Sequence, residues 1–252
     1  MKIFVINLAR SPERRSSIEQ QLSLLNLNYE IIDAIDGSQL SYSDIIKETR
    51  PLSYAVTCGE IGCALSHINI YRKMVRENIP IALVLEDDAV LDYRSTQVMH
   101  ELEKICNQSP TVTLLTETSQ YIGKPKYALN DQLSIYNVLE ASCSHGYIIN
   151  FQAAIKLAAF LYPVWMVADK WQILREYSVC NVEAVIPPII RKSEHSELTT
   201  IQFYKNCSWL EGRKEYIWNE IKKGRPLKIK LKRLIWTSLG RVFIKIIKAQ
   251  GS

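Results

Sequence analysis

The sequence predicts an α/β fold with a parallel sheet, and two stretches carry this prediction. Residues 2–8 form a short apolar run of strand-forming residues, the pattern from Pro12 onward indicates a helix, and residues 29–33 read as a second strand. This β-α-β order favours a parallel sheet with a nucleotide-type crevice at the strand ends. Residues 81–85, Ile-Ala-Leu-Val-Leu, are continuously apolar, which is typical of a central strand buried on both faces.

The remaining elements follow from the same patterns. Ser11 precedes Pro12 as a candidate N-cap, and Ile18, Leu22 and Leu25 give the first helix its apolar stripe. Residues 36–57 are expected to form a loop with one short helix, and residues 191–208 an irregular stretch. We expect further helices at 59–78, 152–161 and 168–177, and further strands at 112–116, 133–139, 147–150 and 182–190.

Composition limits the class of protein. Of 252 residues, 47% are hydrophobic, 23% are charged and only 18 are Gly or Pro. These values exclude disordered, collagen-like and low-complexity classes. The length allows one large α/β domain or two small ones.

Three adjacent carboxylates, Glu86-Asp87-Asp88, directly follow the central strand. Their mutual repulsion costs stability unless a positive group binds there, and Mg²⁺ or Mn²⁺ with diphosphate oxygens meets that need. In strand geometry Glu86 and Asp88 would point the same way and Asp87 the other. The alternative is a solvated acidic turn or helix N-terminus.

Several motifs in order resemble glycosyltransferase family 25, which includes lipopolysaccharide and lipooligosaccharide galactosyltransferases of Gram-negative bacteria and related collagen galactosyltransferase domains. The motifs are Phe4 to Leu8 with Arg10 to Arg14, then Gly59 to His67, then Leu85 to Ala89, and a weaker fourth in Gly146 to Ile149 with Ala153 to Leu157. The resemblance implies a GT-A fold, a nucleotide-sugar donor, a divalent metal and an inverting transfer that makes a β-linkage. In the lipopolysaccharide enzymes the donor is usually UDP-galactose.

The resemblance places the acidic metal motif of GT-A enzymes at the triplet, with Asp88 as the metal ligand and Glu86 and Asp87 as nucleotide-sugar contacts. Asn7 and Arg10 lie just after the first strand, where an open sheet binds nucleotide, and the Arg14 guanidinium suits a diphosphate. A solvated helix face is the alternative for Arg14.

An inverting transfer needs a carboxylate base near the acceptor hydroxyl. Asp169, between Trp165 and Trp171, has the right place in the order of motifs. The two Trp residues are candidates for stacking on sugars. Alternatively, Asp169 caps a helix and both Trp side chains belong to the core.

Glu60 and His67 lie seven residues apart on one predicted helix and so share a face. We assign Glu60 to the catalytic group and His67 to the nucleotide-sugar site, with helix N-terminal charge stabilisation and a buried, satisfied imidazole as the respective alternatives. His145 is a further candidate. His195 is late enough in the chain to be the metal or phosphate ligand that GT-A enzymes often take from a late histidine.

Charge is distributed unevenly along the chain. The formal net charge is +5, yet residues 222–252 hold ten basic residues and no acid, which leaves the remainder at −5. From Ile229 onward, at helical spacing, the apolar residues Leu231, Ile235, Trp236, Leu239, Val242, Phe243, Ile246 and Ile247 group on one side and Lys230, Arg233, Arg241, Lys245 and Lys248 on the other. A basic amphipathic helix with this make-up is typical of interfacial membrane binding. The alternatives are a helix packed on the catalytic domain and, third, a nucleic-acid contact, which we do not expect because no matching domain motif is present.

We therefore predict a GT-A-type, Rossmann-like catalytic domain at 1–210 and a basic amphipathic C-terminal region at 211–252, which contacts an anionic inner leaflet through residues 225–248. No signal peptide or membrane span is recognisable, and the six scattered cysteines suit reduced thiols. The expected location is cytoplasmic, peripheral on the inner face of the inner membrane. Cys58, Cys63 and His67 form a weak candidate metal cluster that lacks a fourth ligand.

The expected activity is transfer of a hexose, galactose from UDP-galactose, to a lipopolysaccharide or lipooligosaccharide core sugar. UDP-glucose or another UDP-sugar is the alternative donor. The rival classes are a metal-dependent phosphoesterase that uses the same carboxylates and a non-catalytic membrane scaffold.

Overall fold

The computed structural model describes residues 1–105, 108–193 and 208–249. The strands are β1 (Lys2–Asn7), β2 (Glu30–Asp33), β3 (Ile81–Glu86), β4 (Ala89–Leu91), β5 (Thr111–Leu114), β6 (Gln120–Ile122), β7 (Tyr127–Ala128), β8 (Ser134–Glu140), β9 (Gly146–Asn150), β10 (Asn181–Ile186), β11 (Ile190–Lys192) and β12 (Ile246–Lys248). The helices are α1 (Pro12–Leu24), α2 (Tyr42–Glu48), α3 (Cys58–Arg76), α4 (Ser95–Lys104), α5 (Phe151–Leu161), α6 (Trp171–Glu176), α7 (Ser208–Lys223), α8 (Leu227–Ile235) and α9 (Arg241–Phe243), with a 3₁₀ turn at Gly37–Gln39 and a π-helical turn at Trp236–Gly240. None of the described helices is long and apolar enough to cross a lipid bilayer.

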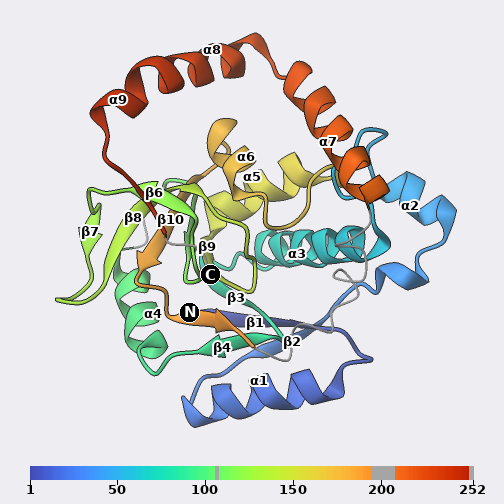
Figure 1. Ribbon diagram of the computed structural model, residues 1–252. Helices are drawn as coiled ribbons and strands as arrows, with labels where there is room; N and C mark the ends of the chain where they lie inside the picture. The colour runs from blue at the N-terminus through green and yellow to red at the C-terminus, as the bar shows by residue number, and fades with distance from the viewer. Residues whose placement is uncertain (106–107, 194–207, 250–252) are drawn as a thin grey trace.

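One large mixed sheet forms the centre of the molecule, with strand order β12-β6-β8-β10-β5-β9-β3-β1-β2 and β7 paired to β8 (Figure 1). Strands β2, β1, β3, β5 and β10 run in the same direction, and β9 lies antiparallel between β3 and β5. The predicted α/β, Rossmann-like domain of the GT-A type is therefore confirmed, with the addition of the antiparallel strands. The carboxyl ends of the parallel strands meet at one edge, which is where such sheets bind ligands.

Helices cover both faces of the sheet. Along β1, Phe4 and Ile6 belong to the buried cluster shared with α3, α5, α6 and α7, whereas Ile3 and Val5 belong to the cluster shared with α1 and α4. This alternation follows from the two-residue period of a strand. Because both faces are buried, the continuously apolar sequences of β1 and β3 are explained.

Two predicted elements need correction. The strand expected at 182–190 is split into β10 and β11, because Pro187 and Pro188 interrupt it and cannot donate to a ladder. The helix expected from Ile229 through Lys248 ends at Phe243, and residues 246–248 are instead the edge strand β12, paired antiparallel with β6. Backbone pairing at the open edge of β6 outweighs the helical pattern there.

The C-terminal segment contacts the rest of the molecule at several points. Ile217 and Ile221 of α7 lie in the core cluster with α3 and α5. Arg225, buried, forms a 2.7 Å ion pair with Glu176 of α6, which also pairs with Arg233. In Figure 1, α7 and α8 (orange to red) pass over the α5 and α6 side of the sheet. The domain boundary at 210 stays a prediction.

Candidate functional site

The candidate site lies where β1 and β3 end. In their parallel register Ile6 is opposite Glu86, so Asn7 comes beside the start of the acidic triplet. Strand β9, antiparallel to β3, begins at the same edge with Gly146 opposite Leu85. It therefore brings Ser144 and His145, which directly precede it, to the triplet.

Glu86 is held by two donors. Ser144 Oγ donates to Glu86 Oε1 at 2.5 Å, and His67 Nε2 lies 3.3 Å from the same oxygen. Burial alone would raise the pKa of Glu86, but the hydrogen bond and the charge of His67, with Ser144 and His145, lower it to about 2. Glu86 therefore carries its negative charge at all physiological pH values.

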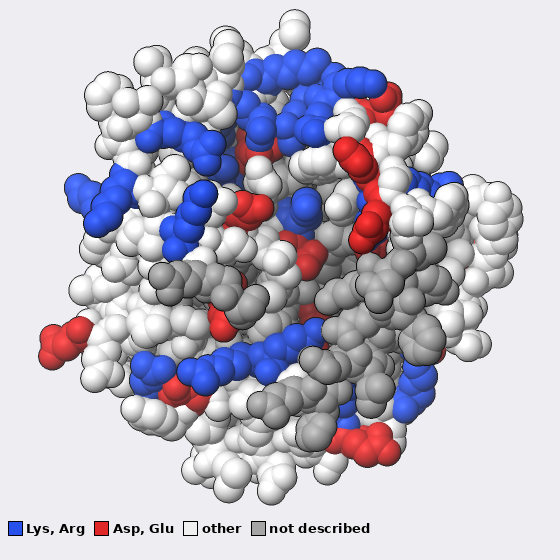
Figure 2. All heavy atoms as spheres, viewed as in Figure 1, with Lys and Arg blue, Asp and Glu red and all other residues white. Residues whose placement is uncertain are grey.

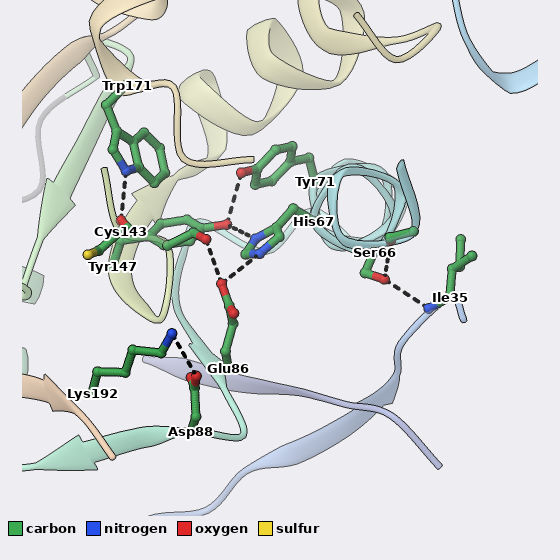
Figure 3. A network of polar contacts seen from close by, with 12 residues as sticks. Ile35, Ser66, His67, Tyr71, Glu86, Asp88, Cys143, Tyr147, Trp171 and Lys192 are labelled. Carbon is green, nitrogen blue, oxygen red and sulfur yellow. Dashed lines mark hydrogen bonds and ion pairs between the residues drawn. The ribbon is translucent and has the colours of Figure 1, made fainter. Parts of the chain in front are cut away.

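His67 connects this carboxylate to the core. Its Nδ1 lies 2.7 Å from the Tyr147 hydroxyl, which in turn lies 2.9 Å from the Tyr71 hydroxyl (Figure 3). The side chain of His67 is 2% exposed. The imidazole is thus buried with both nitrogens satisfied, which was the alternative interpretation for His67. It also contacts Glu86, which was predicted to bind the nucleotide sugar.

Helix α3 is positioned by the motif that includes His67. A capping box joins Thr57 and Glu60 at its N-terminus. At Gly62 an added Cβ would lie 2.5 Å from the Ile35 carbonyl oxygen, so only glycine permits this approach. Ser66 Oγ accepts a hydrogen bond from Ile35 N at 2.8 Å and donates to Gly62 O at 2.7 Å. Thus the Gly59 to His67 sequence docks α3 against the chain after β2.

Asp87 faces the first strand and helix. Its Oδ2 accepts a 2.8 Å hydrogen bond from Asn7 Nδ2, and its Oδ1 lies 3.4 Å from an Arg14 guanidinium nitrogen. Burial raises the pKa of Asp87, and these two partners oppose the rise. The structure therefore brings together Asn7, Arg14 and Asp87, as predicted.

Asp88 is buried and incompletely paired. Its Oδ1 has no hydrogen-bond partner among the described residues, and its Oδ2 lies 3.7 Å from Lys192 Nζ (Figure 3). Burial, the Glu86 charge and the Asp87 charge raise its pKa to about 6, and Lys192 opposes them. The predicted strand alternation through Asp88 is wrong, because β3 ends at Glu86 and residues 87–88 form a turn into β4.

Asp169 is close enough to Glu86 and Glu60 for their charges to act on it. Burial, with the charges of Glu86 and Glu60, raises its pKa to about 6, and Lys170 opposes the rise. Helix α6 has Lys170 at its N-cap, so Asp169 does not cap it. Trp165 and Trp171 are core residues, 7% and 1% exposed, so the predicted stacking on sugars is wrong for both.

The remaining predicted residues are placed as follows. Arg10 forms an ion pair with Asp36. Glu60 Oε2 accepts hydrogen bonds from Val56 N and Thr57 N, and its Oε1 pairs with Lys214, so the structure gives Glu60 an N-terminal capping role. Its catalytic role and that of Asp169 stay predictions. His195 lies outside the described residues.

One further residue of the site, Lys192, was not predicted, and another, His145, was named as a further candidate without an assigned role. Lys192 reaches Asp88 from β11, and no local pattern marks it, because the approach depends on the pairing of β11 with β4. His145 is buried, and its Nε2 has no partner among the described residues. Burial lowers the pKa of His145, which favours the neutral imidazole that binds metals.

Two of these residues carry atoms of the kind that divalent cations bind. Asp88 offers an orphaned, buried carboxylate oxygen, and His145 offers an orphaned ring nitrogen near Glu86. A second group, Cys63, His67 and Glu86, has ligand atoms within 4.8 Å of one another. Burial and the nearby carboxylates raise the pKa of Cys63 well above its usual value, which favours the thiol over the metal-binding thiolate. Cys58 is exposed and lies outside this group.

Charged side chains of both signs lie on this face. Figure 2 shows acidic side chains at the centre of the face, with Lys and Arg side chains along the C-terminal helices above and in a second row below. An acidic centre within a basic surround is suited to a cation with an anionic ligand such as a diphosphate.

The sequence of this chain is similar to those of several known proteins. The family described as Glycosyltransferase family 25 (LPS biosynthesis protein) matches residues 1–171. A Glycosyltransferase 25 family member of Drosophila melanogaster is 32% identical over 63% of this chain. Procollagen galactosyltransferase 1-B of Xenopus laevis and procollagen galactosyltransferase 2 of Homo sapiens are 26% and 28% identical, each over 62% of this chain. The matched region spans 28%, 28% and 27% of these three relatives, little more than a quarter of each.

Proposed function

The chain belongs to glycosyltransferase family 25, and on that premise we propose that it transfers galactose from UDP-galactose to a core sugar of lipopolysaccharide or lipooligosaccharide, with inversion to a β-linkage. The observation that carries the proposal is the acidic end of β3, where Asp88 keeps a buried carboxylate oxygen without a partner among the described residues. A buried carboxylate with one oxygen unsatisfied costs stability, and a metal-bound nucleotide would offset that cost.

The donor and acceptor rest on the names of relatives. Two of them are procollagen galactosyltransferases, which supports galactose, and the family description mentions LPS biosynthesis, which supports the acceptor. UDP-glucose is the alternative donor, and a collagen-type acceptor follows from the same relatives. A panel of donors and acceptors separates these cases.

Asp169 is proposed as the general base. A carboxyl group with a pKa of about 6 is ionised at neutral pH and still accepts a proton readily. In the proposed transfer it takes the proton of the acceptor hydroxyl as that oxygen bonds to the anomeric carbon. The bond between this carbon and the UDP oxygen breaks on the opposite face, and UDP leaves with the electron pair.

The other residues bind and orient the donor. Asn7 and Arg14 hold Asp87, and the Arg14 side chain, 28% exposed, is available to contact a diphosphate. Glu86 is fixed by His67 and Ser144 for a contact to the nucleotide sugar. We propose Asp88 and His145 as ligands of Mn²⁺ or Mg²⁺. The cation would neutralise charge on the departing UDP as a Lewis acid.

We further propose that residues 225–248 hold the protein against an anionic membrane, at the inner face of an inner membrane. The apolar side of α8 and the turns after it points away from the protein: Leu231, Leu234, Leu239, Val242 and Phe243 are 58%, 61%, 59%, 72% and 84% exposed. Exposed lysines such as Lys228 and Lys230 flank this strip. An apolar strip beside basic residues suits an anionic lipid surface.

The test is release of UDP by the purified full chain. UDP-galactose, UDP-glucose and other UDP-sugars are each supplied with Mn²⁺ and either a lipopolysaccharide core oligosaccharide or a procollagen peptide. We expect turnover of UDP-galactose with the core oligosaccharide. If no nucleotide sugar is bound or turned over, the transferase proposal fails.

The rival classes give different results. A phosphoesterase would hydrolyse a phosphate ester without any sugar acceptor. A scaffold would keep its function in cells after Asp88→Ala, whereas the transferase would lose it.

A further inference from the structure

Beside Asp169, a lysine is held between two aromatic rings. Lys170 Nζ lies 5.1 Å from the centre of the Tyr54 ring and 5.2 Å from that of Trp218. The two rings meet edge to face, with centroids 5.6 Å apart at 62°. Tyr54 precedes α3 and Trp218 belongs to α7, so this arrangement exists only because α7 packs back against the first half of the chain. Cation–π contacts fix the ammonium group in position.

The charge of Lys170 is not compensated by a salt bridge. Two other cations contact the same rings: Lys214, 5.2 Å from the Tyr54 ring, and Arg225, 5.4 Å from the Trp218 ring. Lys214 forms an ion pair with Glu60, and Arg225 forms one with Glu176. Within the described ranges no carboxylate oxygen lies within 4.0 Å of Lys170 Nζ. Lys214 and Arg225 are thus each compensated by a carboxylate, whereas Lys170 is not, and its ammonium group is suited to an anionic ligand.

The position of this lysine assigns it to the acceptor rather than the donor. The positive side chains that act most strongly on Asp88 are Lys192 and Arg14, which lie toward β11 and α1. The positive side chain that acts most strongly on Asp169 is Lys170, and Glu60, at the start of α3, acts on Asp169 as well. Lys192 and Arg14 are therefore the cations near the proposed donor diphosphate, whereas Lys170 is the cation near the proposed base.

We propose that Lys170, fixed by Tyr54 and Trp218, binds an anionic group of the acceptor, a carboxylate or a phosphate monoester, and so positions the acceptor beside Asp169. The inference deepens the proposed function and rests on it, because it takes Asp169 as the base. It names the acceptor class as an acidic or phosphorylated saccharide. Helix α7, through Trp218, is then part of the acceptor site.

Binding tests this without catalysis. The full chain with Mn²⁺ and UDP is titrated with galactose, galacturonate and galactose 6-phosphate, and dissociation constants are measured by ligand-observed NMR. The two anionic sugars separate a carboxylate source from a phosphate source. A charge-assisted hydrogen bond contributes about 1.5–3 kcal/mol, so at least one of them is expected to bind about tenfold or more tighter than galactose.

Variants assign the effect to this lysine. Lys170→Met keeps the apolar stem and is expected to abolish the preference for the anionic sugar, while Lys170→Arg keeps part of it. Trp218→Leu is expected to weaken the preference, because the ammonium loses one of its two rings. Lys47→Met, at an exposed site on α2, is the matched control and leaves all constants unchanged.

Four outcomes would overturn the proposal. Equal binding of neutral and anionic sugars by the unsubstituted chain is one, and an unchanged preference in Lys170→Met is another. A loss of UDP affinity in Lys170→Met would assign the lysine to the donor. If that variant only shifts the pH dependence of UDP release, the lysine merely tunes Asp169. Absence of UDP binding by the unsubstituted chain would instead contradict the proposed function, and is scored separately.

Discussion

The His67 imidazole lies 3.3 Å from Glu86 through Nε2, and through Nδ1 it is 2.7 Å from the buried Tyr147 hydroxyl. The conformation of the carboxylate at the end of β3 is therefore set by a chain of buried polar groups that runs through α3 to β9. Because each buried group in such a chain needs its partner, the site and the core are energetically connected.

The first prediction concerns this chain. Tyr147→Phe removes the hydroxyl that contacts both His67 Nδ1 and the Tyr71 hydroxyl. These two buried groups then lose a hydrogen-bond partner. We expect the free energy of unfolding to fall by about 1–3 kcal/mol in urea denaturation. Tyr93→Phe, at a side chain that is 81% exposed, is the control and should change it by less than about 0.5 kcal/mol. Equal effects of the two substitutions would mean that the network is not needed.

The second prediction concerns Asp88. Asp88→Asn keeps the shape but removes the charge proposed to bind the cation, so Mn²⁺-dependent UDP release should fall by about 100-fold or more. In buffer with EDTA the variant should unfold at the same or higher urea concentration, because burial and the Glu86 and Asp87 charges disfavour the ionised form of Asp88 more than Lys192 favours it. Asp92→Asn is the control: its carboxylate pairs with Arg94 and is not among the proposed metal ligands, so metal-dependent activity should be kept. Retained metal-dependent activity in Asp88→Asn would contradict the ligand assignment.

The third prediction concerns pH. The Asp169 carboxyl, with its pKa raised to about 6, must be ionised to accept a proton. Transfer under saturating donor should therefore be low below pH 6, rise through pH 6 and level off above it. In Asp169→Asn the rise in rate through pH 6 should disappear, along with most of the activity. The control Asp131→Asn, at an exposed position, should keep the rise and the activity. A midpoint near 4, the usual value for aspartate, would contradict the assignment.

The fourth prediction concerns the close approach of α3 to the chain after β2. In Gly62→Ala the new Cβ would lie 2.5 Å from Ile35 O and 2.7 Å from Gly37 N, both backbone atoms that cannot rotate away. We expect a loss of about 1–3 kcal/mol in the free energy of unfolding. Gly212→Ala, where an added Cβ meets nothing within 4 Å, should be neutral or slightly stabilising. A stable Gly62→Ala variant would show that α3 can shift.

Local sequence patterns predicted the elements that carry their own signal. The apolar runs of β1 and β3 and the Ser-Pro start of α1 predicted these elements correctly, and the three carboxylates lie at the end of β3 as expected. His67 and Glu86 were both assigned to the nucleotide-sugar site, and the structure places His67 Nε2 3.3 Å from Glu86 Oε1.

What the sequence did not predict depends on contacts between distant segments. Lys192 reaches Asp88 only through the pairing of β11 with β4, and Lys170 meets Trp218 only because α7 folds back. The sequence leaves sugar stacking and the core as alternatives for Trp171, and the structure favours the core, where Nε1 donates to Cys143 O at 2.8 Å. Ile246 and Ile247 fit a helical stripe and an edge strand equally well. They form a strand because the edge of β6 is free to pair with them.

The fifth prediction concerns the proposed membrane surface. Deleting residues 225–252 is a poor test, because it removes the buried Arg225–Glu176 pair and the buried Ile229 together with the exposed strip. Leu234→Glu with Phe243→Glu instead changes side chains that are 61% and 84% exposed and leaves those contacts intact. Each substitution opposes insertion of the apolar strip and repels an anionic surface, so binding to vesicles with anionic lipid should fall about tenfold or more in a flotation assay. Tyr42→Glu, 80% exposed on α2, is the matched control and should float as the unsubstituted chain does. If the double variant floats unchanged while its denaturation curve is also unchanged, α8 is not the surface that contacts lipid.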